Sequence, residues 1–224
     1  FHADRDPDRG RSVISPASYG VAGPSMNRTP TTDGIVTGCC DSCDRAERYI
    51  EAVDIRLRGL LAVERRRWQP RYPSLAMGFD AVEDFVLGGG KRLRPRFAFW
   101  GHEAVDGRQD LRALVDLGAA IELFHAFALI HDDVMDASDT RRHAPTVPHR
   151  FAALHRAGAW AGEQRRVSEA FAMLLGDLAF AYSTQLLSEL PERTRVLFDE
   201  MRVELHVGQY LDLVGAARAA SSAE

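Results

Sequence analysis

The segment from about residue 110 to 136 limits the possible fold more than any other part of the sequence. Apolar residues occupy most of the circumference of the helix that this segment predicts, and such a helix belongs in the buried centre of a protein. We therefore expect one sizeable domain built round it, which fits a length of 224 residues. The apolar positions are Leu111, Leu114, Val115, Leu117, Ile121, Leu123, Phe124, Phe127 and Ile130.

The rest of the chain predicts further helices and no sheet. Apolar residues recur at helical spacing, and glycine or proline separates the periodic segments. No stretch alternates in the way of a strand with hairpin turns, so the predicted fold class is all-α. The first expected helix runs from about Asp44 to Pro70, with Ile50, Val53, Leu57, Leu60 and Leu61 on one face. Further helices are expected over about 74–87, from about Arg94 to Asp106, and over about 110–136, 162–189 and 192–219. The segment His143–Gly158 is expected to be a loop with a short helix.

The first 43 residues differ in composition from the rest. They are rich in Asp, Arg, Gly, Pro, Ser and Thr and lack apolar periodicity, so we expect a disordered or loosely attached tail at 1–43 before a helical domain at 44–224. The three cysteines are Cys39, Cys40 and Cys43. A zinc site would need a fourth ligand, and the nearest downstream histidine, His102, belongs to another predicted element. Reduced thiols in the cytoplasm are therefore expected.

Composition argues against two classes of partner. The net charge of −4 gives no reason to expect nucleic acid. No apolar run reaches the roughly 18–20 residues of a membrane span, so no span is expected. The hydrophobic fraction of 46% and the charged fraction of 27% are those of an ordinary globular protein.

Three aspartates lie where the apolar helix ends, in the sequence LIHDDVMDASDTRR. Carboxylates at that end oppose the helix dipole and repel one another, so a positive partner is expected. Asp136 lies about 40° round the helix from Asp132 and about 6 Å further along, while Asp133 lies about 100° to the side. Oxygen ligands of this kind suit Mg²⁺, which takes further ligands from substrate phosphates. We predict a metal-bound diphosphate on Asp132 and Asp136; the alternative is a solvated helix end.

Positive charge gathers in two other places. GGGKRLRP at 88–95 combines three glycines with three cations ahead of a helix start, which favours anion binding, although it lacks the spacing of a P-loop. Arg141 and Arg142 follow the aspartates and can each grip phosphate oxygens. His125 lies about 20° from the line of Asp132 and about 10 Å below it. These groups predict a second, metal-free diphosphate site; the alternatives are a flexible basic loop and, for His125 as for His131, a core histidine.

The ordered motifs resemble those of the polyprenyl synthetase family, the trans-isoprenyl diphosphate synthases. The resemblance covers about residues 75–215. It rests on GGGKRLRPR (88–96), the segment 122–149 with DDVMD and the two arginines, LLGDLAFA (174–181) and GQYLDL (208–213). It implies an all-α bundle round a central cavity and a homodimer through long helices. It also implies head-to-tail condensation of isopentenyl diphosphate with an allylic diphosphate, with Mg²⁺ as the cofactor.

The resemblance also implies roles for individual residues. Isopentenyl diphosphate is expected on Lys91, Arg94, His125 and Arg142. Mg²⁺ is expected on Asp132 and Asp136 with Asp133 in support, and the allylic diphosphate on Arg141, so that Asp132, Asp136 and Arg141 are the catalytic group. Gln209 and Asp212 are expected to face the same cavity. Phe127 and Ala128, just below the aspartates, resemble the type that makes the twenty-carbon geranylgeranyl product.

The sequence departs from the family pattern at one point. The family's second aspartate-rich motif, more than a hundred residues after the first, has no counterpart before Glu224. The chain therefore looks like the N-terminal part of a synthase. A fragment is the favoured explanation, beside an inactive homologue that acts as a partner subunit and a second chain that supplies the missing half. A terpene cyclase ranks lower, since it does not require the second diphosphate site.

Overall fold

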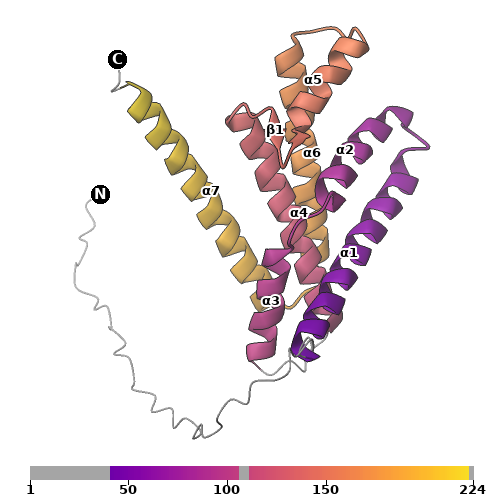
Figure 1. The fold of residues 1–224 in the computed structure, drawn as a ribbon, viewed down its shortest axis with the longest axis vertical. Coiled ribbons are helices and arrows are strands. Elements are labelled where there is room, and N and C mark those ends of the chain that lie inside the picture. Colours follow the sequence, from indigo (N-terminus) through magenta and orange to yellow (C-terminus); the bar gives the residue numbers. More distant parts are fainter. Residues whose placement is uncertain (1–40, 106–110, 222–224) are drawn as a thin grey trace, which may run out of the picture. The chain divides into compact units, whose positions relative to one another are not determined.

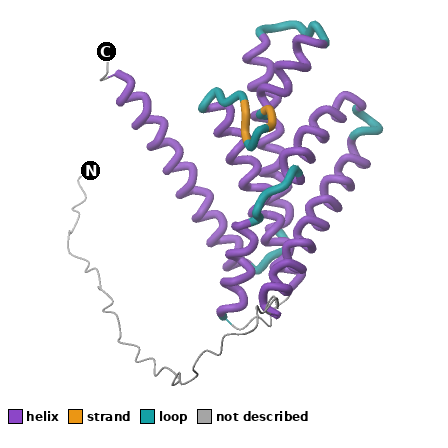
Figure 2. The backbone as a smooth tube through the Cα atoms, viewed as in Figure 1, coloured by secondary structure: helices purple, strands orange, loops and turns teal. Residues whose placement is uncertain are grey.

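The computed structural model describes residues 41–105 and 111–221, and these residues form an all-α fold, as the sequence predicts. Figures 1 and 2 show the helices, with one pair of very short strands beyond the end of α4. The elements are α1 (Asp41–Trp68), η1 (Pro73–Leu75), α2 (Ala76–Leu87), α3 (Leu93–Ala104), α4 (Leu111–Met135), β1 (Thr140–Arg141), β2 (Ala144–Pro145), α5 (Val147–Ala157), α6 (Gln164–Leu187) and α7 (Glu192–Ser221).

Several boundaries differ from the sequence expectation. Helix α1 begins at Asp41, three residues earlier than expected, and α4 ends at Met135, so Asp136 follows the helix. The segment 143–158, expected to be a loop with a short helix, contains α5, and Thr146 caps that helix by accepting a hydrogen bond from the backbone of His149 (3.4 Å). Residues 1–40 of the expected tail, with Cys39 and Cys40, lie outside the described residues, as does the expected end of α3 at Asp106.

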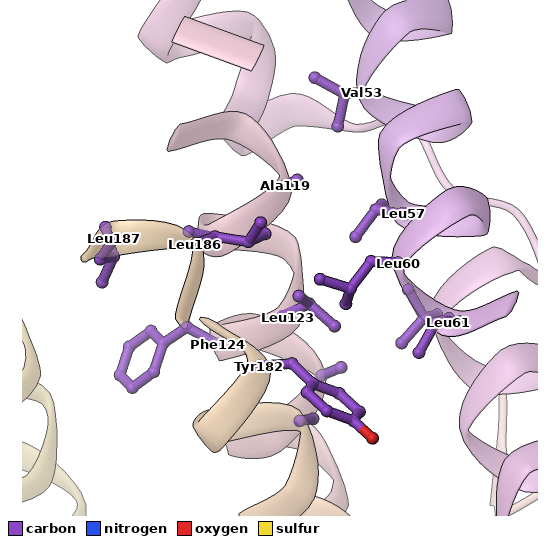
Figure 3. Close-up of a cluster of buried hydrophobic side chains, with 14 of the residues drawn as sticks. Val53, Leu57, Leu60, Leu61, Ala119, Leu123, Phe124, Tyr182, Leu186 and Leu187 are labelled. Carbon is purple, nitrogen blue, oxygen red and sulfur yellow. The ribbon is translucent and has the colours of Figure 1, made fainter. Parts of the chain in front are cut away.

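Helix α4 is the centre of this bundle, as expected. It packs against α1, α2, α3, α5 and α6. Figure 3 shows Leu57 and Leu61 of α1 beside Leu123 of α4, and all three side chains are fully buried. Burial of each such side chain contributes about 1.5–3 kcal/mol. The first turn of α4 differs from the expectation, since Leu111 is exposed.

Small residues let α4 approach its neighbours closely. A Cβ atom on Gly118 would lie 2.3 Å from the Tyr49 hydroxyl of α1, and that hydroxyl donates a hydrogen bond to the carbonyl of Leu114 (3.1 Å). On the opposite side, the Ser183 hydroxyl of α6 donates to the carbonyl of Ala120 (2.8 Å). These contacts fix the rotation of α4, and hence the direction in which its last turn presents the aspartates.

Arg92 ties the glycine-rich loop to three helices. Its backbone is left-handed, with φ of 46°, and its side chain is buried. The guanidinium donates to Asp54 of α1 (2.9 Å), to Glu122 of α4 (2.7 Å) and to the carbonyl of Val86 at the end of α2 (2.8 Å). Because each of the three guanidinium nitrogens meets an acceptor, and two of these acceptors are carboxylates, the buried charge is compensated and the loop is held against the middle of α4.

Helix α7 contacts the other helices through its first half only. Phe198 and Arg202 are buried, whereas most large apolar side chains beyond Arg202 are exposed. Figure 1 shows α7 diverging from α4 and α6 along its length.

Two described helices, α4 and α6, are long and apolar enough to cross a membrane by length and composition alone. The sequence expectation that no segment reaches this length is therefore not supported by that criterion. A core helix passes the same test, and in α4 61% of the apolar window is buried inside the protein.

Candidate functional site

The three aspartates at the end of α4 point in different directions. The backbone of Asp136 donates a hydrogen bond to the carbonyl of Asp132 (2.8 Å), so helical spacing continues to Asp136 and keeps these two residues on one face. The Asp132 side chain is 31% exposed and Asp136 is exposed, whereas the Asp133 side chain is fully buried. Only Asp132 and Asp136 therefore present carboxylates toward solvent.

Arg141 is the positive partner that the acidic helix end required. Its Nη2 donates to Asp132 and its Nε to Asp133, each at 2.8 Å. The pairing of β1 with β2, with Arg141 opposite Ala144, turns the chain back so that Arg141 reaches the helix end. Burial raises the pKa of Asp133, and the hydrogen bond from Arg141 acts against that rise. Its Oδ2 atom is buried without a hydrogen-bond partner within the described chain.

This geometry separates two roles among the aspartates. Asp133 holds Arg141, and its burial leaves it poorly placed to bind an ion directly. Over 41–105 and 111–221, no three His, Cys, Asp or Glu side chains are close enough to hold an ion by themselves. Asp132 and Asp136 still fit Mg²⁺, because this ion is commonly held by one or two carboxylates, with water and phosphate oxygens as the other ligands.

A basic pocket brings together residues from three separate parts of the sequence. Its volume is about 300 Å³. It is lined by Gly90, Lys91, Arg92, Leu93, Arg94, Glu122, His125 and Arg142. Lys91, Arg94, His125 and Arg142, the four residues expected to bind isopentenyl diphosphate, all lie in it. Arg92 and Glu122 pair with each other, so the positive charge of Lys91, Arg94 and Arg142 is not cancelled by Glu122.

Glycines allow the loop to approach Arg142 closely. Gly89 and Gly90 have φ angles of +95° and +153°, and a Cβ atom on Gly90 would lie 3.2 Å from Nη1 of Arg142. The same Nη1 donates to the carbonyl of Gly89 (2.8 Å). The glycine-rich loop therefore positions one of the pocket's cations in addition to carrying others.

His125 is uncharged in this pocket at neutral pH. Burial, followed by the positive charges of Arg94 and Arg142, lowers its pKa to about 4. A neutral imidazole carries one N–H, so His125 can donate a single hydrogen bond to a bound anion.

The residues expected to set product length lie on another side of α4. The Phe127 ring is 5.1 Å from that of Phe180 in α6 and 5.7 Å from that of His206 in α7, measured between ring centroids. Ala128 is half-buried against the main core. Of the two residues expected on the cavity wall from α7, Asp212 is exposed and Gln209 half-exposed, and neither lines the basic pocket.

The sequence interpretation missed several residues that support the site. Asp54, Glu122 and Val86 hold Arg92. Asp54 and Val86 belong to no recognisable motif, and Glu122, at the start of the motif segment 122–149, was given no role. Arg150 of α5 donates to Asp84 of α2 (2.6 Å), and both line a second pocket of about 440 Å³ that also includes Arg141 and Arg142. The signal available in the sequence was an acidic residue on a mostly apolar helix: both Glu122 and Asp116 of α4 are buried and paired with an arginine.

Comparisons with known proteins point to one family. The chain is 34% identical over 141 residues to the geranylgeranyl diphosphate synthase of Methanosarcina mazei, a match that covers 60% of this chain and 38% of that protein. It is 34% identical over 111 residues to heptaprenyl diphosphate synthase component 2 of Geobacillus stearothermophilus, covering 50% and 29%. The chain thus spans well under half the length of these curated relatives.

A solved structure is similar in both fold and sequence. The crystal structure of geranylgeranyl pyrophosphate synthase from Corynebacterium glutamicum, complexed with isoprenyl diphosphate and magnesium, superposes with a TM-score of 0.68 at 34% identity. The match covers 73% of this chain and 49% of that one. The family model described as polyprenyl synthetase matches residues 78–224, more than half of the sequence. The chain therefore belongs to the polyprenyl synthetase family.

Proposed function

We propose that this protein is a head-to-tail prenyltransferase that condenses isopentenyl diphosphate with an allylic diphosphate. The observation that carries the proposal is a basic pocket and a pair of aspartates beside the same helix, which we take as two separate diphosphate sites. One consists of Lys91, Arg94, His125 and Arg142 in the basic pocket. The other would consist of Asp132 and Asp136 at the end of α4, with a metal ion bound between them and the diphosphate. Two diphosphates held by different means suit a reaction between two diphosphate substrates.

In the proposed reaction, the bond between the allylic carbon and its diphosphate oxygen breaks, and pyrophosphate leaves with the electron pair. The double bond of isopentenyl diphosphate then forms the new carbon–carbon bond, and a proton is lost to restore a double bond. Arg141, beside Asp132, is positioned to stabilise the negative charge on the leaving pyrophosphate. Mg²⁺ bound by Asp132 and Asp136 would add positive charge at the same place.

The basic pocket orients the second substrate. Lys91, Arg94 and Arg142 would neutralise the diphosphate of isopentenyl diphosphate, and neutral His125 would donate one hydrogen bond to it. The pocket contains no exposed carboxylate, because Glu122 is engaged by Arg92. It therefore suits an anion that arrives without a metal ion.

We propose geranylgeranyl diphosphate as the product, with Phe127 and Ala128 below the aspartates as the residues that limit tail growth. The support is twofold: the sequence DDVMD with a small residue at 128, and the names of relatives from Methanosarcina mazei and Corynebacterium glutamicum.

A second candidate function is a subunit that binds prenyl diphosphates and requires a partner chain for turnover. The similarity to heptaprenyl diphosphate synthase component 2 favours it, because that name denotes one part of a larger enzyme. A terpene cyclase is less favoured, since a cyclase would leave the basic pocket without a use.

We also propose a homodimer and a cytoplasmic location, which light scattering and cell fractionation would check.

The test is to incubate the 224-residue chain with labelled isopentenyl diphosphate, farnesyl diphosphate and Mg²⁺, and to identify the product. Lys91→Ala and Arg142→Ala should each raise KM for isopentenyl diphosphate by about tenfold or more, because each removes a charged contact to the substrate. Arg165→Ala, on the exposed face of α6, is the matched control and should behave as wild type.

The outcomes separate the candidates. Formation of geranylgeranyl diphosphate supports the synthase. Tight binding of isopentenyl diphosphate without product supports the binding subunit. A chain that binds no isopentenyl diphosphate, or binds it equally well after Lys91→Ala and Arg142→Ala, contradicts both.

A further inference from the structure

A buried arginine lies among aromatic rings between α4, α6 and α7. The guanidinium carbon of Arg202 is 4.6 Å from the ring centroid of Phe180, 4.8 Å from that of Phe198 and 5.7 Å from that of Phe124. The residue is only 8% exposed. We call Phe124, Phe180, Phe198 and Arg202 the arginine cage.

The polar contacts of Arg202 only partly offset its burial. Nη1 donates to Asp199 (3.0 Å), whose side chain is largely exposed, and Nη2 donates to the hydroxyl groups of Thr184 (3.1 Å) and Ser183 (3.4 Å). The Nε atom has no hydrogen-bond partner in the described part of the chain. The ring faces therefore supply a substantial share of what stabilises this cation.

The arginine cage lies against Phe127. The Phe127 ring is 5.1 Å from that of Phe180 and 5.6 Å from that of Phe124, between centroids. Phe124 lies one helical turn further from the aspartates than Phe127. On the proposed function, a prenyl tail that starts at the aspartates and grows along α4 passes Ala128 and then reaches Phe127, against which two rings of the cage are packed.

The cage makes this barrier stiffer than Phe127 alone. A tail that pushed Phe180 or Phe124 aside would remove ring faces from Arg202 and bring hydrocarbon against a buried charge. An alkyl chain offers no hydrogen bonds and no quadrupole, so it cannot replace what the cation loses. A phenylalanine packed only on apolar neighbours could move aside without that penalty.

We infer that Arg202 is a positioning residue that sets the maximum length of the prenyl product, by holding Phe180 and Phe124 behind Phe127. The inference rests on the proposed function. It adds a specificity determinant on α6 and α7, outside the sequence motifs, and it implies that charge, as well as bulk, stops chain growth.

The test compares tail-length profiles of binding. Affinities of the 224-residue chain for farnesyl, geranylgeranyl and longer prenyl diphosphates are measured with Mg²⁺ present. In the wild type, affinity should fall by about tenfold or more at the first homologue longer than geranylgeranyl diphosphate. Arg202→Met keeps an unbranched stem without the charge, and Phe180→Ala opens the cage. Both should remove that fall, whereas Arg202→Lys should retain it.

Leu174→Ala, an exposed apolar position of the same helix α6, is the matched control and should keep the wild-type profile. If Arg202→Met does not fold, Phe180→Ala and Arg202→Lys decide the question. An unchanged length limit in Phe180→Ala or Arg202→Met, or equal weakening for every tail length, would overturn the inference.

The inference and the proposed function can fail separately. If the wild type binds the series but forms no product, the proposed activity of this chain fails, and the tail-length profiles still decide the role of Arg202. If the wild type binds no prenyl diphosphate, both are overturned.

Discussion

His125 and Asp133 are two helical turns apart on α4, and burial favours the neutral form of each. The pKa of His125 falls to about 4, chiefly through burial and then through Arg94 and Arg142. The pKa of Asp133 rises through burial, against the effect of Arg141. For His125 the consequence is a neutral donor at physiological pH, so the charge of the basic pocket comes from its lysine and arginines.

The lowered pKa of His125 predicts a specific pH dependence of stability. The unfolded state, with an ordinary histidine pKa near 6.5, takes up the proton first as pH falls. The stability that neutral His125 contributes is therefore fully present above about pH 6.5 and is lost as pH falls toward about 4. After allowance for solvent screening, the loss should be about 1–2 kcal/mol. His125→Gln should lack this part of the slope in urea unfolding measured from pH 7 to 4. Parallel slopes for both proteins would contradict the assignment.

At the scale of elements, the adjacent residues Lys91 and Arg92 are expected to have different roles. Arg92 stabilises the fold, and Lys91 is proposed to bind substrate. Arg92→Met should lower the free energy of unfolding by about 3–5 kcal/mol, because Glu122 would keep a buried, unpaired charge. Lys91→Met, at an exposed position, should change the unfolding free energy by less than about 0.5 kcal/mol while weakening isopentenyl diphosphate binding. Denaturant unfolding and a binding titration on both variants check this. Equal stability losses would refute the separation.

The packing of α1 against α4 predicts opposite effects for two glycine substitutions. Gly118→Ala should destabilise the protein by about 1–3 kcal/mol, since its Cβ atom would overlap the Tyr49 hydroxyl. Gly59→Ala, within α1 and with no atom near its Cβ position, should stabilise it by about 0.5–1 kcal/mol through helix propensity. Thermal unfolding of the two variants provides the measurement. A stabilised Gly118→Ala variant would show that α1 and α4 do not pack as described.

At the scale of the whole molecule, the sequence predicted what depends on periodicity and missed what depends on the path of the chain between helices. The buried face of the first helix, from Ile50 to Leu61, was predicted correctly, because apolar residues recur there with the 3.6-residue period of a helix. The attachment of Arg141 to Asp133 was not predicted. It depends on a turn with left-handed backbone at Ala137 and Arg142, positions where the sequence has no glycine to signal it.

The candidate site likewise has a part that was expected from the sequence and a part that was missed. The grouping of Lys91, Arg94, His125 and Arg142 was expected from the family resemblance, and the structure brings the four together in one pocket. The arginine cage was missed, because Arg202 has the sequence pattern of an ordinary charged residue on an amphipathic helix. The rings that surround it come partly from α4 and α6, which are distant in the sequence.

The two proposed anion sites should respond differently to removal of Mg²⁺, since only the site at Asp132 and Asp136 is proposed to draw positive charge from a metal ion. Addition of EDTA should weaken farnesyl diphosphate binding by about tenfold or more, because repulsion from Asp132 and Asp136 is then no longer screened. Isopentenyl diphosphate binding should change by less than about twofold, because Lys91, Arg94 and Arg142 supply its charge. Calorimetric titration of each ligand with and without EDTA measures both effects, and Asp136→Asn should mimic EDTA for the first ligand alone. Equal losses for the two ligands would mean that the basic pocket does not act as a separate, metal-free site.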